Sequence, residues 1–167
     1  CKYCDGRSEK YYVTGDFEKD IEIRENLPEI LTKEIGKLRE RGFIVAGSGV
    51  SDPYQQSEIN EKIMRSATQI VLDNGLPMIV LTKSALVLRD IDLFKQINTY
   101  SRMILMVSLT FSDDEVRKIF EPNASSVDER LRVLSEFSKQ GIPTGVLMMP
   151  LLPRISDIEK NINELLY

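Results

Sequence analysis

The residues with the clearest capacity for chemistry are the two cysteines, Cys1 and Cys4, which stand at the start of the sequence with two residues between them. Thiolates at this spacing bind metal ions or form redox pairs. Two cysteines are too few for the disulfide scaffold of a small secreted protein, so the pair fits a reducing, cytoplasmic compartment. Zinc, redox and iron–sulfur sites all remain open on the spacing alone.

The composition narrows the chemistry further, because the 167 residues contain no histidine. This excludes Ser-His-Asp and Cys-His catalysis and removes the commonest zinc ligand. Any reaction must therefore use carboxylates, lysine, tyrosine, serine or a cofactor.

Charge and hydropathy limit the partners. The net charge of −4 and the sequence pI of about 5.1 do not support broad electrostatic binding to nucleic acid, which needs a basic face; only a local basic groove would permit it. No apolar run approaches the roughly 20 residues of a membrane helix, so no membrane association is expected. We expect one domain over residues 1–167, which is enough chain for a sizeable core.

Alternating segments of two kinds must position the reactive residues. Short apolar runs predict strands, and apolar residues at helical spacing predict helices between them. The strands are expected at 20–25, 43–46, 77–82, 103–107 and 143–149. The helices are expected at 26–42, 59–75, 88–97, 113–119, 126–139 and 156–166. Asn26, Ser126 and Ser156 each precede a glutamate by three residues, which predicts capping boxes at three of the helix starts.

Most of these strands are apolar on both faces, which is typical of a parallel sheet covered by helices. A doubly wound open sheet and a partial barrel of strand–helix units both fit this pattern. In either architecture ligands bind at the carboxyl ends of the strands. Ser51, Asp52, Lys83 and Ser108 fall at or just after these ends, so we expect the binding site there.

Four ordered blocks resemble a known family. Cys1-Lys2-Tyr3-Cys4 resembles the end of the Cys-x3-Cys-x-aromatic-Cys motif of radical S-adenosylmethionine (SAM) enzymes. Residues 49–55 with Glu58, residues 121–124 with Arg130, and residues 141–153 resemble the spore photoproduct lyase-like branch, which is related to DNA repair photolyases. This resemblance spans nearly the whole chain and favours a partial (β/α)6 barrel of the α/β class with its first strand missing.

The resemblance implies a specific chemistry. Three thiolates hold three irons of a [4Fe–4S] cluster, and SAM chelates the fourth iron through its amino and carboxylate groups; soft thiolates suit such clusters. One electron, from a donor such as a ferredoxin or flavodoxin, then cleaves SAM. The resulting 5′-deoxyadenosyl radical abstracts hydrogen from a substrate, here unknown, in a reaction similar to that of spore photoproduct lyase.

The resemblance also implies roles for individual residues. Cys1 and Cys4 match the second and third cluster ligands, and Tyr3 matches the aromatic residue beside the adenine. Ser51 matches a SAM-contacting serine, and Lys83 matches a lysine that reaches the methionine carboxylate.

Three further residues are weaker candidates for the same site. Ser108 matches a polar contact to the ribose or methionyl part of SAM. Asp52 is either a helix cap or a ligand in the SAM region. Arg130 is either a contact in that region or a helical surface arginine paired with nearby acids.

The sequence departs from the family pattern at two points. The first cluster cysteine is absent from these residues, so the third ligand is expected upstream of Cys1. Gly49 stands where the lyase has its hydrogen-donor cysteine, so thymine-dimer reversal by the lyase route is not expected.

The rival interpretations are a non-catalytic metal- or nucleic-acid-binding module with zinc on the cysteine pair, and a nucleotide-binding enzyme that uses the glycines at 47–49. Those glycines match neither a P-loop nor a GxGxxG motif.

Overall fold

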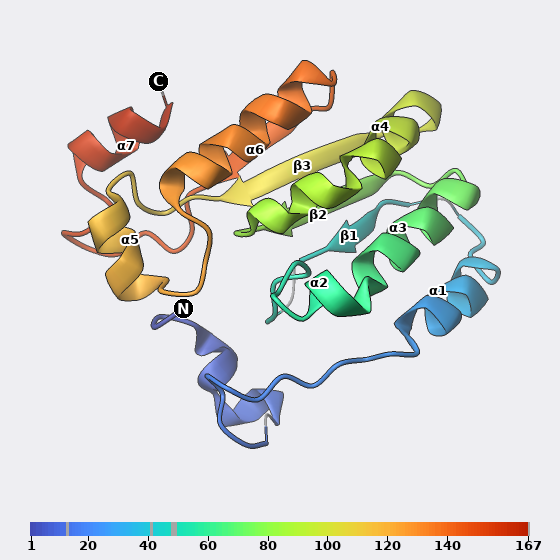
Figure 1. Cartoon of the computed structure of the whole chain (residues 1–167), viewed down its shortest axis with the longest axis horizontal. Coiled ribbons are helices and arrows are strands. Elements are labelled where there is room, and N and C mark those ends of the chain that lie inside the picture. Colours follow the sequence, from blue (N-terminus) through green and yellow to red (C-terminus); the bar gives the residue numbers. More distant parts are fainter. Residues whose placement is uncertain (13, 41, 48–49, 167) are drawn as a thin grey trace.

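A computed structural model describes residues 1–12, 14–40, 42–47 and 50–166, and its centre is one parallel sheet (Figure 1). The strands are β1 (Ile44–Ala46), β2 (Met78–Thr82), β3 (Met103–Ser108) and β4 (Thr144–Leu147). They lie in the order β1-β2-β3-β4, so each strand pairs with the next one along the chain. A doubly wound sheet would reverse this order at a switch point. The continuous order instead confirms the partial barrel.

Helices cover one face of the sheet. The longer helices are α1 (Leu27–Ile35), α3 (Ile63–Asp73), α4 (Ile91–Tyr100) and α6 (Val127–Lys139), and Figure 1 shows α3, α4 and α6 side by side across the strands. The shorter elements are α2 (Glu58–Glu61), α5 (Asp114–Phe120), α7 (Glu159–Leu166), and the 3-10 turns η1 (Asp5–Arg7), η2 (Glu9–Tyr11) and η3 (Ala85–Asp90).

The core fills the layer between helices and sheet. Val80 of β2 and Leu105 of β3 are fully buried beneath Phe94 of α4 and Phe137 of α6. The two phenylalanine rings pack with centroids 5.7 Å apart. Alternate residues of β2 and β3 are only half-buried, because they point to the opposite face of the sheet.

Four of the five predicted strands are confirmed, and one is wrong. Residues 20–24 form no regular structure, and Ile21 and Ile23 are 52% and 40% exposed. Alternation over so few residues does not define a strand unless a neighbouring strand and a core are present to pair with and pack against. The predicted helix over 59–75 is divided at Lys62, which adopts a left-handed conformation with φ 52° between α2 and α3.

One of the three predicted capping boxes is confirmed. The Ser126 hydroxyl accepts from the Glu129 amide, and the Glu129 carboxylate accepts from the Ser126 amide. Asn26 makes no side-chain cap bond. The cap at Ser156 is wrong: this buried hydroxyl instead accepts from the Leu152 amide at 2.7 Å and closes the turn that precedes α7.

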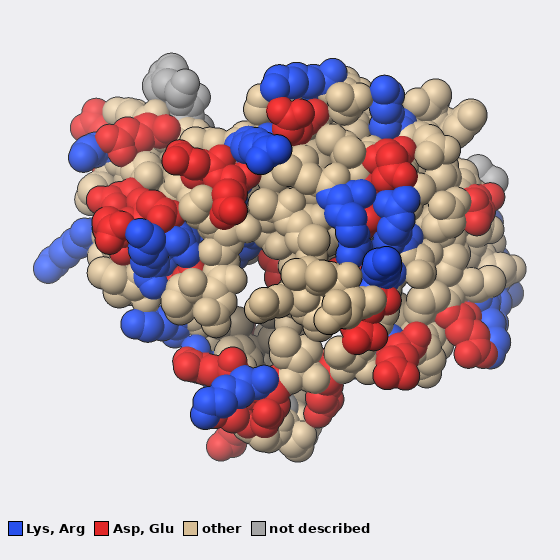
Figure 2. Space-filling model, in the orientation of Figure 1, with Lys and Arg blue, Asp and Glu red and all other residues tan. Residues whose placement is uncertain are grey.

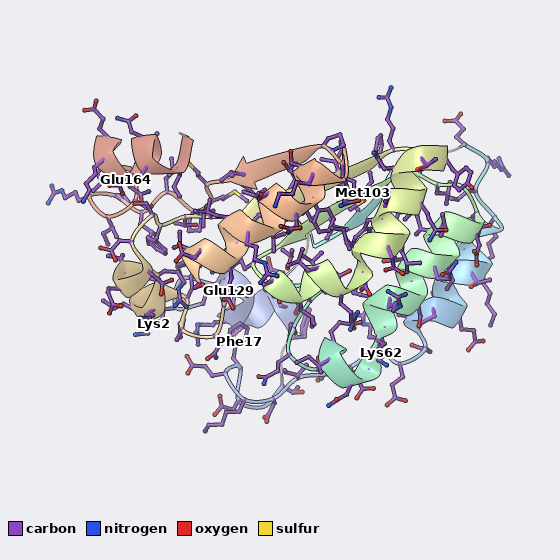
Figure 3. The ribbon with its side chains drawn as sticks, turned by 45° about the horizontal axis from the view of Figure 1, so that its top comes forward. Lys2, Phe17, Lys62, Met103, Glu129 and Glu164 are labelled. Atoms are coloured by element: carbon purple, nitrogen blue, oxygen red, sulfur yellow. The ribbon has the colours of Figure 1, made fainter. Side chains whose placement is uncertain are left out.

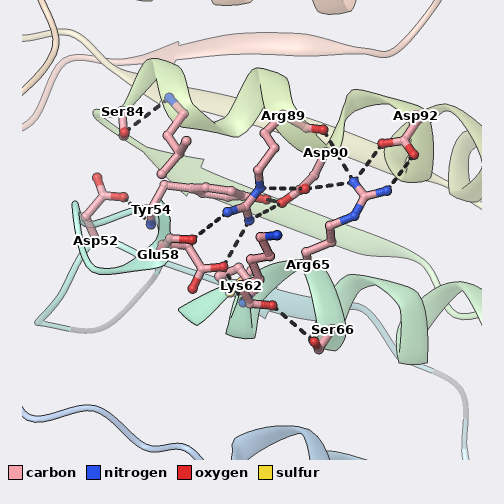
Figure 4. A network of polar contacts seen from close by, with 12 residues as sticks. Asp52, Tyr54, Glu58, Lys62, Arg65, Ser66, Ser84, Arg89, Asp90 and Asp92 are labelled. Carbon is pink, nitrogen blue, oxygen red and sulfur yellow. Dashed lines mark hydrogen bonds and ion pairs between the residues drawn. The ribbon is translucent and has the colours of Figure 1, made fainter. Parts of the chain in front are cut away.

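A buried aspartate ties the loop after β1 to the helical layer (Figure 4). The carboxylate of Asp90, which is 0% exposed, accepts from the Tyr54 hydroxyl at 3.0 Å, from Arg65 at 2.9 Å and from Arg89 at 2.7 Å. Arg89 also pairs with Glu58 at 3.0 Å. Because each buried charge has an opposite charge in contact, the loop is fixed without leaving an isolated ion.

We expect Asp90→Asn to lower the free energy of unfolding by about 1.5–3 kcal/mol, because it removes the buried carboxylate that binds Arg65, Arg89 and the Tyr54 hydroxyl, while Arg89 keeps Glu58 as its partner. The matched control is Asp92→Asn, which removes a carboxylate that is 54% exposed from the same Arg65 and should cost less than about 1 kcal/mol. Urea unfolding followed by circular dichroism measures both values. Equal losses would show that the Asp90 network does not hold the loop.

Candidate active site at the carboxyl ends of the strands

Residues 1–6, which we call the cysteine loop, lie at the edge of the sheet where the strands end. The Lys2 amide donates to the Phe120 carbonyl at 2.8 Å, and the Tyr3 hydroxyl donates to Glu121. In Figure 3, Lys2 and Glu129 lie towards one end of the molecule and Met103, the first residue of β3, lies towards the other. The first residues of the chain therefore contact the strand-end loops.

Cys1 is exposed and Cys4 is half-buried, and both are free thiols. Cys4 lies beside buried Gly6, where an added Cβ would be 3.1 Å from Cys4 Sγ and would collide with a methyl group of Val50. Glycine thus lets the cysteine loop contact the loop after β1. In the part of the chain that the structure describes, no three histidine, cysteine or acidic side chains are grouped to hold a metal ion. Two thiols fit two of the three cluster ligands.

Lys83 follows β2 directly and its backbone is held from two sides. Its amide donates to Asp52 at 2.6 Å, and its carbonyl accepts from the Ser125 amide at 3.3 Å. Burial lowers the pKa of the Lys83 ammonium, although the carboxylate of Glu121 opposes that shift. An anionic ligand group would therefore stabilise the partly buried ammonium of Lys83.

Asp52 uses both carboxylate oxygens within the protein. Besides the Lys83 amide, they accept from the Tyr54 amide at 2.9 Å and from the Thr82 hydroxyl at 2.6 Å. The predicted helix-cap role is wrong, because the helix that follows, α2, has Ser57 as its N-cap. The Asp52 carboxylate instead closes a turn at Tyr54 and binds the end of β2 at Thr82 and the Lys83 amide, which the sequence did not indicate. Ser51 beside it is exposed, and Gly49 lies outside the described residues.

Arg130 is a buried residue rather than a surface one, with an exposed fraction of 1%. It pairs with Glu121, itself 0% exposed, at 2.6 Å and donates to the Ser108 carbonyl at 2.9 Å. Glu121 also accepts from Tyr3, and burial together with this carboxylate raises the pKa of the Tyr3 phenol. The sequence placed Glu121 in a motif but gave it no role, since its partners are distant along the chain.

Two buried polar atoms at this edge lack a protein partner. Ser108 Oγ and Arg130 Nε make no hydrogen bond to any described residue. An unsatisfied buried polar atom costs about 1–3 kcal/mol, so these atoms fit a ligand that carries polar groups of its own. The amino acid and ribose parts of SAM carry such groups, and the free thiols of Cys1 and Cys4 fit two of the three thiolate ligands of a [4Fe–4S] cluster.

A second arginine, Arg117, holds the loop 121–126 through its backbone carbonyls. Buried Arg117 donates to the carbonyls of Glu121 and Ala124, both at 3.0 Å, and pairs with Asp114 at 2.8 Å. Asp114 also accepts from the Val127 amide at 3.1 Å. The hydrogen bond from Arg117, assisted by that amide, lowers the pKa of Asp114 to about 2.

The shifted pKa of Asp114 predicts a pH dependence. The ionised carboxylate stabilises the fold above its unfolded-state value of about 3.9, and this stabilisation is lost as the pH falls towards about 2. Asp114→Asn should therefore destabilise the protein at pH 7, and the difference from wild type should shrink between pH 4 and pH 2. Thermal unfolding across this range measures it, with Glu115→Gln as the exposed control. A difference that does not change with pH would contradict the assignment.

Comparison with known proteins identifies the family. The model of the radical SAM superfamily matches residues 1–166. An uncharacterized protein of Methanocaldococcus jannaschii is 32% identical over 167 residues, which cover 98% of this chain and 60% of that protein. An uncharacterized protein of Mycobacterium tuberculosis is 26% identical over 170 residues, covering 99% of this chain and 50% of that protein. An uncharacterized protein of Acidianus two-tailed virus is 32% identical over 130 residues, covering 77% and 41%. No solved structure matches significantly.

The chain spans 50% to 60% of the length of the first two of these relatives. Among the described residues, no helix is both long and apolar enough to cross a membrane. The superfamily uses a [4Fe–4S] cluster and SAM, and its enzymes generally need a reductant such as ferredoxin or flavodoxin. On the match over almost its full length, the chain belongs to the radical SAM superfamily.

Proposed function

We propose that this chain is the single-domain core of an enzyme that cleaves SAM reductively and uses the radical formed for hydrogen abstraction from a substrate. The observation that carries the proposal is the convergence of the cysteine loop with Lys83, Ser108 and Arg130 at one edge of the sheet. Polar atoms of the last two are buried there without a protein partner. When bound, a cluster held by Cys1, Cys4 and a third thiolate would supply the electron for reductive cleavage of SAM.

The residues of the chain bind and orient these groups. Cys1 and Cys4 supply two thiolate ligands, and we infer that the third lies upstream. The Tyr3 ring provides a surface for the adenine. The Lys83 ammonium suits the methionine carboxylate, because a partly desolvated cation gains most from an anionic partner. The unpartnered Ser108 Oγ and Arg130 Nε suit acceptor oxygens of the ribose or the methionyl part, and Ser51 and Asp52 border the same region.

We assign the protein to the spore photoproduct lyase-like branch, with a different substrate. Support comes from the sequence blocks at 49–55, 121–124 and 141–153, two of which contribute Asp52 and Glu121 to the site. Figure 2 shows basic and acidic side chains intermixed on the visible face, so that face does not favour a nucleic acid. We further infer that the protein is cytoplasmic and takes its electron from a ferredoxin or flavodoxin.

Anaerobic reconstitution of the full-length protein with iron and sulfide tests the proposal. The visible absorption of a [4Fe–4S] cluster should appear, and reduction with dithionite in the presence of SAM should release methionine and 5′-deoxyadenosine. Cys4→Ala should abolish the cluster. A colourless protein that binds zinc and does not cleave SAM would instead identify a non-catalytic zinc module.

We expect Lys83→Met to weaken SAM binding about 10- to 100-fold, as loss of a hydrogen bond to a charged group predicts. The cluster absorption should be unchanged, because Lys83 is not a ligand. Isothermal titration under anaerobic conditions measures the affinity, and Lys118→Met, an exposed lysine on α5, is the control. Unchanged SAM affinity in Lys83→Met would remove Lys83 from the binding site.

A further inference from the structure

The loop between α5 and α6, residues 121–126, links the two parts of the candidate site, namely the cysteine loop and the turn that carries Lys83. Immediately before it, at the last residue of α5, the Phe120 carbonyl accepts from the Lys2 amide at 2.8 Å, and Glu121, the first loop residue, accepts from the Tyr3 hydroxyl. At its end, Ser125 donates its amide to the Lys83 carbonyl at 3.3 Å and accepts the Ala85 amide on its hydroxyl at 2.8 Å. This loop therefore sets the cysteine loop relative to the turn that carries Lys83.

Glu121 is the side chain at the centre of this arrangement. One carboxylate oxygen accepts from Arg130 at 2.6 Å and the other accepts from the Tyr3 hydroxyl. Arg130 in turn donates to the carbonyl of Ser108, the last residue of β3, at 2.9 Å. A continuous series of hydrogen bonds thus connects the cysteine loop to the end of β3.

The burial of these hydrogen-bonded side chains indicates that they fix the geometry of the site rather than stabilise the fold. Glu121 and Arg130 are 0% and 1% exposed, and a buried ion pair is often no more stabilising than apolar residues of similar volume. A tyrosine beside an adenine needs only its ring, so a phenylalanine would serve that purpose. The hydroxyl of Tyr3 is then available for a second task, and it donates to Glu121, which Arg130 connects to the end of β3.

We propose that Glu121 is a positioning residue that acts through Tyr3. By holding the Tyr3 hydroxyl, it fixes the segment between Cys1 and Cys4 at a set distance from Ser108 and Lys83. The proposal rests on the proposed function for its catalytic meaning, but it makes a claim about the protein without cofactors as well. Loss of the Tyr3–Glu121 bond should loosen the cysteine loop while the sheet and its helices stay folded.

The first test uses the cofactor-free, full-length protein. Iodoacetamide labelling of Cys4 is followed by trypsin digestion, and cleavage after Lys2 and Arg7 separates the peptide of Cys4 from that of Cys1. Tyr3→Phe should raise the labelling rate of Cys4 roughly 3- to 10-fold, as expected for the loss of one hydrogen bond. Tyr100→Phe, which changes a hydroxyl on an exposed side chain of α4, should leave the rate unchanged.

Glu121→Gln should act in the same way, because an amide offers one acceptor oxygen where the carboxylate offers two. If the two side chains act through their mutual bond, the double variant should label no faster than the faster single variant. Glu115→Gln on the exposed side of α5 is the control. If Glu121→Gln fails to fold because Arg130 loses its counter-charge, Tyr3→Phe still decides, since it leaves the ion pair intact.

The second test uses the reconstituted protein. Tyr3→Phe should hold a full cluster but change the electron paramagnetic resonance spectrum of the reduced cluster in the presence of SAM, and should raise the KM for SAM more than it lowers kcat. A role in folding alone would lower the melting temperature and leave the spectrum unchanged below it.

The outcomes separate the two proposals. A wild-type protein that forms no cluster contradicts the proposed function, whereas the labelling rates still test the positioning role of Glu121. If wild type forms the cluster and cleaves SAM, but Tyr3→Phe matches it in labelling rate, spectrum and KM, the positioning role of Glu121 is wrong.

Discussion

The ion pair between Glu121 and Arg130 is the interaction on which the candidate site depends. It joins the end of β3 to the loop 121–126, and that loop contacts both the cysteine loop and the turn at Lys83. Two charges removed from water hold each other in one orientation, because any displacement leaves one of them uncompensated. Arg117, paired with Asp114, holds the same loop through hydrogen bonds to the carbonyls of Glu121 and Ala124. The fold therefore fixes the position of the loop through electrostatics as well as through its apolar core.

The parallel sheet explains why residues so distant in sequence meet at this edge. Every strand runs in the same direction and pairs with the next, so the segments after β1, β2 and β3 leave the sheet side by side. Asp52 from the first segment can then bind the amide of Lys83 from the second. The Asp90 network holds the first segment in place through Tyr54. The strand order thus determines which residues meet at the site, and hydrogen bonds between them fix their final positions.

The sequence predicted the parts of this structure that depend on local pattern. Strands such as β2 and β3 are apolar along their length and are recognised as strands, although only alternate residues are buried under the helices. The Ser126 capping box depends on residues three apart, but the same spacing at Asn26 and Ser156 forms no such box. The strand over 20–25 was wrong because alternation does not reveal whether a neighbouring strand exists. The bond between Tyr3 and Glu121 joins residues 118 apart in the chain, so no local pattern could reveal it. The role of Asp52 was left between two alternatives for the same reason, since its partner Thr82 lies on another strand.

The state of the acidic residues bears on the kind of chemistry the site can support. Asp52 accepts from three donors, Glu121 accepts from two, and Asp90 is surrounded by arginines and a tyrosine hydroxyl. A carboxylate whose oxygens already accept hydrogen bonds from the protein is poorly placed to reach a substrate proton as a general base. These three carboxylates bind and orient groups of the protein itself. Such a site suits a reaction in which the cofactors supply the reactive species and the surrounding residues determine where it is released.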